Sequence, residues 1–162
     1  MGNPAFSLPT LEAISNSRHD VKAIISNPPK PMGRKRILKH TEVGNFALQN
    51  KIDLIELGSF NDKAYKKLSS IDVDIFVVVA FRILPEKFIS IPKFGSINLH
   101  ASILPKYRGA APIQWSLMNG DSTTGISVFQ IEKKVDAGKI IIQEKLNIDK
   151  NDNYEIISNK LS

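Results

Sequence analysis

Hydrophobic positions along the chain recur with two periods, one typical of helices and one typical of strands. In residues 8–17 the apolar side chains Leu8, Leu11 and Ile14 are spaced three apart, which predicts an amphipathic helix. Residues 73–80 (VDIFVVVA) form instead an almost unbroken apolar run of strand length. A strand of this kind is typically covered on both faces, as in a parallel sheet.

The rest of the chain continues this alternation. Further helices are predicted at residues 41–49, 61–69, 110–118 and 152–162. Further strands are predicted at residues 21–25, 51–56, 95–99, 125–131 and 139–144. Strands that alternate with helices are typical of a doubly wound α/β fold with a mostly parallel sheet, which is the fold class we expect.

Composition limits the class of protein. Of the 162 residues, 42% are hydrophobic and 23% are charged, as in soluble globular domains. No apolar run approaches the roughly 20 residues that span a bilayer, so we expect a cytoplasmic protein without a membrane segment. The chain has no cysteine, and its three histidines lie far apart in the sequence, which argues against a bound metal. We also expect a monomer.

The net charge of +6 is concentrated in one segment. Five cations and no acid fall within ten residues: Lys30, Arg34, Lys35, Arg36 and Lys39. Three prolines and a glycine in residues 27–36 predict an exposed segment without regular structure. Such a cluster is typical of a contact with a polyanion, although a merely solvated run of charge has the same composition.

Candidate chemistry lies at the end of the strand predicted at residues 95–99. Asn98 and His100 are two residues apart, so on an extended chain their side chains point to the same side. An amide donor and a protonated imidazole together suit a developing oxyanion. Asp136, in a predicted turn, could orient His100, keep it protonated and relay a proton through water.

The same three residues also have a plainer interpretation. A histidine at a strand end is often only a satisfied hydrogen-bonding residue, and an asparagine there can cap a turn. An aspartate two residues before a glycine is common in turns that carry no chemistry. Spacing alone leaves both interpretations open.

The surrounding motifs resemble those of the folate-dependent formyltransferases. In that family an Asn-x-His pair is followed by a Ser-(Leu/Ile)-Leu-Pro loop and later by a Val-Asp-Ala-Gly or Leu-Asp-Thr-Gly turn. Here residues 96–114 read SINLHASILPKYRGAAPIQ, and residues 135–138 read VDAG. Three separated motifs in the right order are a specific signal. The RGAAPIQ continuation resembles the methionyl-tRNA branch, and residues 28–36 are similar to the basic loop that reaches the tRNA acceptor arm there.

This resemblance implies a role for particular positions. The catalytic trio of the family matches Asn98, His100 and Asp136. The co-substrate 10-formyltetrahydrofolate is implied to lie near Phe81, Arg82, Ile83, Leu84 and Val135. The tRNA contact is implied for Arg34, with Lys35 and Arg36 assisting by phosphate attraction. Many members have Tyr-Gly where this chain has Phe81 and Arg82, so the detail of the folate loop departs from the family pattern.

The activity implied is formyl transfer from 10-formyltetrahydrofolate to the amino group of initiator methionyl-tRNA. Two alternatives stay open at this point. One is another 10-formyltetrahydrofolate-dependent formyltransferase or hydrolase, and the other is an inactive remnant that binds only RNA or folate.

Compared with the family pattern, residues 1–162 resemble a catalytic domain that is incomplete at both ends. Members begin with a strand just before the turn at which this chain starts, and a carboxyl-terminal tRNA-binding barrel follows their catalytic domain. Without the first strand, we expect a gap between the strands near residues 21–25 and 75–79, or their collapse onto each other, and low stability.

Overall fold

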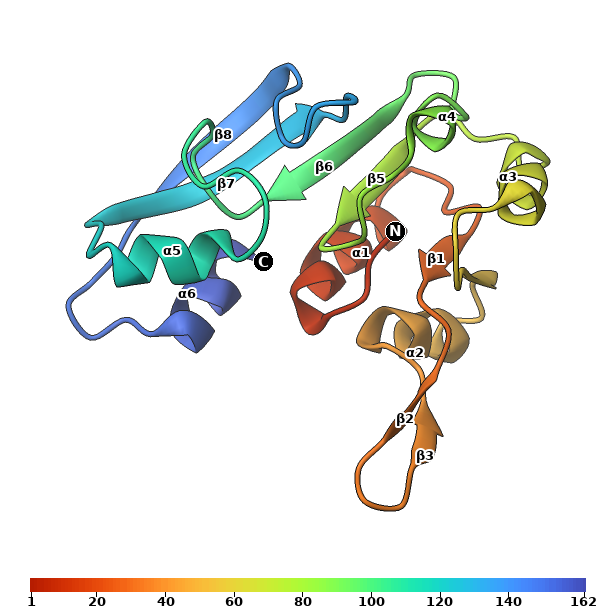
Figure 1. Cartoon of the computed structure of the whole chain (residues 1–162), viewed down its shortest axis with the longest axis horizontal. Coiled ribbons are helices and arrows are strands. Elements are labelled where there is room, and N and C mark those ends of the chain that lie inside the picture. Colours follow the sequence, from red (N-terminus) through yellow and green to blue (C-terminus); the bar gives the residue numbers. More distant parts are fainter. The chain divides into compact units, whose positions relative to one another are not determined.

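The computed structural model describes residues 1–162, which divide into two units. One unit comprises residues 1–73 and 79–84, and the other comprises residues 74–78 and 85–162. Strands and helices alternate along the chain in both units (Figure 1). The predicted α/β fold is confirmed.

The first unit is built around a short parallel pair of strands. Its elements are η1 (Ala5–Ser7), α1 (Leu8–Ser15), β1 (Ile24–Ser26), β2 (Lys30–Met32), β3 (Ile37–Lys39), α2 (Glu42–Gln49), β4 (Leu54–Glu56) and α3 (Asp62–Ser69). Strands β1 and β4 run parallel, with Ile24 opposite Leu54. Ile24 packs with Val43 and Ala47 of α2 in the buried core. Burial of these side chains holds α2 against the strands.

Two helices of this unit are capped by the first residue of the predicted helix range. The hydroxyl of Thr41 accepts a hydrogen bond from the Gly44 N–H at 3.0 Å, at the start of α2. The side chain of Asn61 accepts one from the Ala64 N–H at 2.9 Å, at the start of α3. Each cap satisfies a backbone donor that has no partner inside the helix.

The prediction of irregular structure for residues 27–36 holds for residues 27–29 and for the exposed turn at residues 33–36, but it is wrong for residues 30–32, which form a strand. Strands β2 and β3 form an antiparallel hairpin, which we call the basic hairpin and define as residues 30–39 (Figure 1). Pro31 lies opposite Leu38 within it. A proline lacks a backbone donor but is tolerated in an edge strand, and this hairpin has only two strands.

No strand pairs with both β1 and β5, which belong to separate sheets, as the predicted gap requires, but the first two residues of the sequence bond to residues of both strands. The N–H of Gly2 donates to the Ile25 carbonyl at 3.1 Å, and the Val79 N–H donates to the Met1 carbonyl at 2.9 Å. The first two residues therefore pair with backbone groups that would otherwise lack a partner.

The second unit carries the sheet that positions the candidate site. Its elements, with a strand shared at its start, are β5 (Phe76–Val79), α4 (Glu86–Ile89), β6 (Ser96–His100), α5 (Pro112–Met118), β7 (Thr123–Gln130), β8 (Ile140–Asn147) and α6 (Tyr154–Leu161). The strand order is β5-β6-β7-β8. Strand β7 runs antiparallel to both β6 and β8. Antiparallel strands at the side of an otherwise parallel sheet are common in α/β folds.

Candidate active site

The loop that follows β6, residues 101–111, is fastened to the sheet by buried hydroxyl groups. The Ser127 hydroxyl of β7 donates to the Ser102 carbonyl at 2.6 Å and accepts from the Leu104 N–H at 3.0 Å. The Ser102 hydroxyl donates to the Lys106 carbonyl at 2.6 Å. Both serines are fully buried, so these bonds are shielded from water. We call residues 101–111 the site loop.

His100 is the last residue of β6, and both of its ring nitrogens face acceptors. Its Nε2 donates to the Tyr107 carbonyl at 2.8 Å. Its Nδ1 lies 3.7 Å from the Asp136 carboxylate, and the two side chains are only 8% and 14% exposed. Contacts at both ring nitrogens therefore fix the orientation of the imidazole ring.

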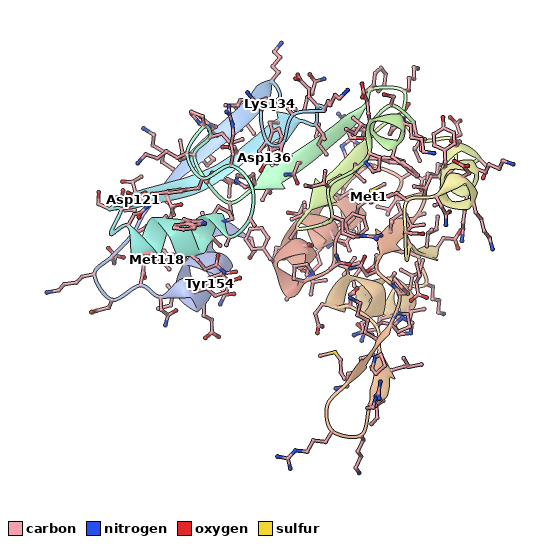
Figure 2. All side chains as sticks on the ribbon, viewed as in Figure 1. Met1, Met118, Asp121, Lys134, Asp136 and Tyr154 are labelled. Atoms are coloured by element: carbon pink, nitrogen blue, oxygen red, sulfur yellow. The ribbon has the colours of Figure 1, made fainter.

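Asp136 is held in place by the site loop. It lies in the connection between β7 and β8, where its backbone adopts a positive φ of 46° (Figure 2). Its carboxylate accepts from the Gly109 N–H at 2.7 Å, and its carbonyl accepts from the Arg108 side chain at 2.8 Å. The position of Asp136 is therefore fixed by two adjacent residues of the site loop.

Asn98 lies two residues before His100 on β6, opposite Phe129 of β7. It is half-buried, and its side chain forms no hydrogen bond within the protein. An amide in this situation is available to a ligand. The structure thus brings the imidazole of His100 and the carboxylate of Asp136 together, and Asn98 lies on the same strand as His100.

Four of the five residues expected near the folate follow β5 in the first unit. Leu84 is buried, whereas Ile83 is 74% exposed. Arg82 donates to the carbonyls of Leu57 and Gly58 at 2.7 and 2.9 Å. Its guanidinium also lies over the rings of Phe60 and Phe81, at 4.7 and 5.3 Å from their centroids, so this loop is tied to the end of β4.

Val135, the fifth residue expected near the folate, belongs to the second unit, next to Asp136, and is 43% exposed.

The three cations predicted to contact tRNA form the turn of the basic hairpin. Arg34, Lys35 and Arg36 are all exposed. The turn is closed by the Arg36 N–H, which donates to the Gly33 carbonyl at 3.1 Å. At the base of the hairpin, His40 lies 2.7 Å from the carboxylate of Glu56.

Sequence reasoning did not find the partners that orient His100 and Asp136. They are the Tyr107 carbonyl and the Gly109 N–H, which are backbone groups. Residue type does not mark such groups in a sequence. In the fold, no group of three or more His, Cys, Asp or Glu side chains is placed to hold a metal, and no helix has the length and apolarity to cross a membrane.

Comparison with curated proteins gives relatives that share nearly all of this chain. A methionyl-tRNA formyltransferase from Thermodesulfovibrio yellowstonii is 42% identical over 99% of this chain and 53% of its own length. One from Bacteroides thetaiotaomicron is 39% identical over 99% of this chain and 50% of its own length. The chain therefore spans about half the length of the curated relatives it matches.

Solved structures share the fold. A phosphoribosylglycinamide formyltransferase from Bacillus halodurans has a TM-score of 0.80 at 17% identity, covering 99% of this chain and 84% of that chain. The formyltransferase PseJ from Anoxybacillus kamchatkensis, in complex with a UDP-sugar and tetrahydrofolate, has a TM-score of 0.59 at 25% identity, covering 86% of this chain and 68% of that chain. The model of the formyl transferase family matches residues 1–162. This chain belongs to the formyl transferase family.

Proposed function

We propose that the protein transfers a formyl group from 10-formyltetrahydrofolate to the amino group of initiator methionyl-tRNA, in preparation for translation initiation. The observation that supports the proposal is the proximity of Asp136 to His100, which lies two residues beyond Asn98 on the same strand, in a chain that is 42% identical to a methionyl-tRNA formyltransferase. The positions match the catalytic trio of the family residue by residue.

The co-substrate would supply the formyl group that the acceptor's amino nitrogen attacks. Asn98 fits this chemistry because its amide has no partner within the protein and lies on the same side of β6 as His100. It would donate to the negative charge that develops on the formyl oxygen. His100, as an imidazolium, would stabilise the same charge.

Asp136 would assist the proton transfers that accompany formyl transfer. Its carboxylate, which faces Nδ1 of His100, would orient the imidazole ring. The 3.7 Å separation between the two side chains is longer than a hydrogen bond, so a proton could pass from the attacking amine through water to the departing nitrogen without the ion pair having to break.

The remaining predicted site residues would bind the two substrates. Phe81, Arg82, Ile83 and Leu84, with Val135, would contact the folate. Arg34 would contact the tRNA, and Lys35 and Arg36 would add attraction for its phosphates.

The test is an acceptor assay with labelled 10-formyltetrahydrofolate. We expect label in methionyl-tRNA and none in glycinamide ribonucleotide or in a 4-amino sugar nucleotide. Label in glycinamide ribonucleotide or in the sugar nucleotide would show that the proposed acceptor is wrong. Release of free formate alone would indicate a hydrolase. Folate or RNA binding without any turnover would indicate an inactive remnant.

A further inference from the structure

The carbonyl that accepts a hydrogen bond from His100 belongs to Tyr107, whose backbone has an uncommon conformation. Tyr107 has a φ of 55°, in the left-handed region that bulky residues rarely adopt. Its carbonyl receives the hydrogen bond from His100 Nε2 at 2.8 Å. A residue stays in this region only when its surroundings fix it there, so the contacts of the Tyr107 side chain decide where the carbonyl points.

The side chain of Tyr107 is anchored at its far end. Its hydroxyl donates to the Asp121 carboxylate at 2.7 Å and accepts from the Asn119 amide at 2.9 Å. Asp121 is only 19% exposed, so its charge is partly shielded from water. A hydrogen bond to a carboxylate is about twice as strong as one between neutral groups.

Asp121 is itself placed by the end of a helix. Helix α5 ends at Met118, and Gly120 turns the chain with a φ of 65° (Figure 2). The Asp121 N–H then donates to the Ser116 carbonyl at 3.0 Å. The anchor of Tyr107 is therefore fixed to the end of helix α5, outside the site loop.

We propose that Tyr107 and Asp121 are positioning residues for His100. The hydrogen bond between them holds the Tyr107 backbone in its left-handed conformation, and the Tyr107 carbonyl in turn keeps the Nε2 proton of His100 and the orientation of its ring. His100 then presents Nδ1 to Asp136. This inference rests on the proposed function for its catalytic consequence, but its structural content can be tested without any turnover.

The test reads the Nε2 proton of His100 by NMR in the ¹⁵N-labelled protein, which contains only three histidines. In the wild type we expect a protected Nε2–H signal. Tyr107→Phe keeps the ring and removes the hydroxyl, and we expect its Nε2 proton to exchange with water at least about tenfold faster. Asp121→Asn retains an acceptor oxygen and should preserve most of the protection.

Lys106→Ala is the matched control. The Lys106 ammonium lies 3.7 Å from the Asp121 carboxylate, but it is 66% exposed and leaves the bond to Tyr107 intact. Its Nε2 exchange should equal that of the wild type. If Tyr107→Phe lowers the melting temperature without changing the exchange, the contact is merely structural and the inference is wrong. An unprotected Nε2–H in the wild type would overturn it as well.

Kinetics give the second readout. Tyr107→Phe should lower kcat by about tenfold and leave KM for the formyl donor unchanged, because a misplaced imidazole affects the transition state more than ground-state binding. An unchanged kcat in an active enzyme would contradict the inference. A wild type without formyl transfer would refute the proposed function, and the NMR result would still decide the positioning role.

Discussion

The site loop and the basic hairpin support their functional side chains in opposite ways. In the site loop, buried hydroxyls, a carboxylate and an anchored tyrosine hold the backbone within hydrogen-bonding reach of His100. In the basic hairpin, the cations stand exposed on a two-stranded ribbon. Chemistry at a developing charge requires groups fixed in advance, whereas attraction to phosphates acts over a longer range and tolerates motion. Substitutions should therefore have different consequences in the two regions.

The largest effect is expected at Asp136. Asp136→Asn keeps an oxygen that can accept from the Gly109 N–H, so the loop should stay folded, but it removes the charge that faces His100. Formyl transfer should fall by about 10²–10⁴-fold, the usual range for an acid or base. Asp149→Asn is the control, since its carboxylate is 80% exposed. Comparable losses in the two variants would remove Asp136 from the mechanism.

Substitutions at Gly138, two residues after Asp136, and at Gly33, in the basic hairpin, would compare how tightly the backbone is constrained in the two regions. A Cβ on Gly138 would lie 1.8 Å from the Gln130 carbonyl, so the backbone between β7 and β8 must shift. A Cβ on Gly33 would meet nothing within 4 Å, and only its φ of 70° opposes it. We expect Gly138→Ala to lower the free energy of unfolding by about 3 kcal/mol and Gly33→Ala to lower it by about 1 kcal/mol. Urea unfolding would measure both, and equal losses would show that the hairpin is as constrained as the site.

The alternation of elements was predictable from the sequence because each buried face repeats a simple period. Helices α2 and α3 begin directly after Thr41 and Asn61, whose side chains cap them. The basic hairpin was missed because three prolines normally break regular structure, whereas an isolated ribbon has room for Pro31. The pairing of Met1 and Gly2 with Ile25 and Val79 was also missed, since residues so far apart in the sequence carry no joint pattern.

The candidate site was predictable in its side chains and not in its support. Asn98 and His100 share a strand face, and Asp136 belongs to a motif that can be recognised in sequence. The groups that orient them are the carbonyl of Tyr107 and the N–H of Gly109. Their placement depends on local backbone angles and on an anchor at Asp121, which only the folded chain brings together.

The smallest effect is expected at Arg34, in the basic hairpin. Arg34→Ala removes one exposed cation and no buried contact, so the melting temperature and the KM for the formyl donor should not change. The KM for methionyl-tRNA should rise by about tenfold, and the slope of log affinity against log salt should fall by about 1, as expected when one phosphate contact is lost. Lys63→Ala, which removes an exposed cation from α3, is the control. An equal loss for folate and tRNA would show that the hairpin supports the fold, and the contrast with the site loop would then disappear.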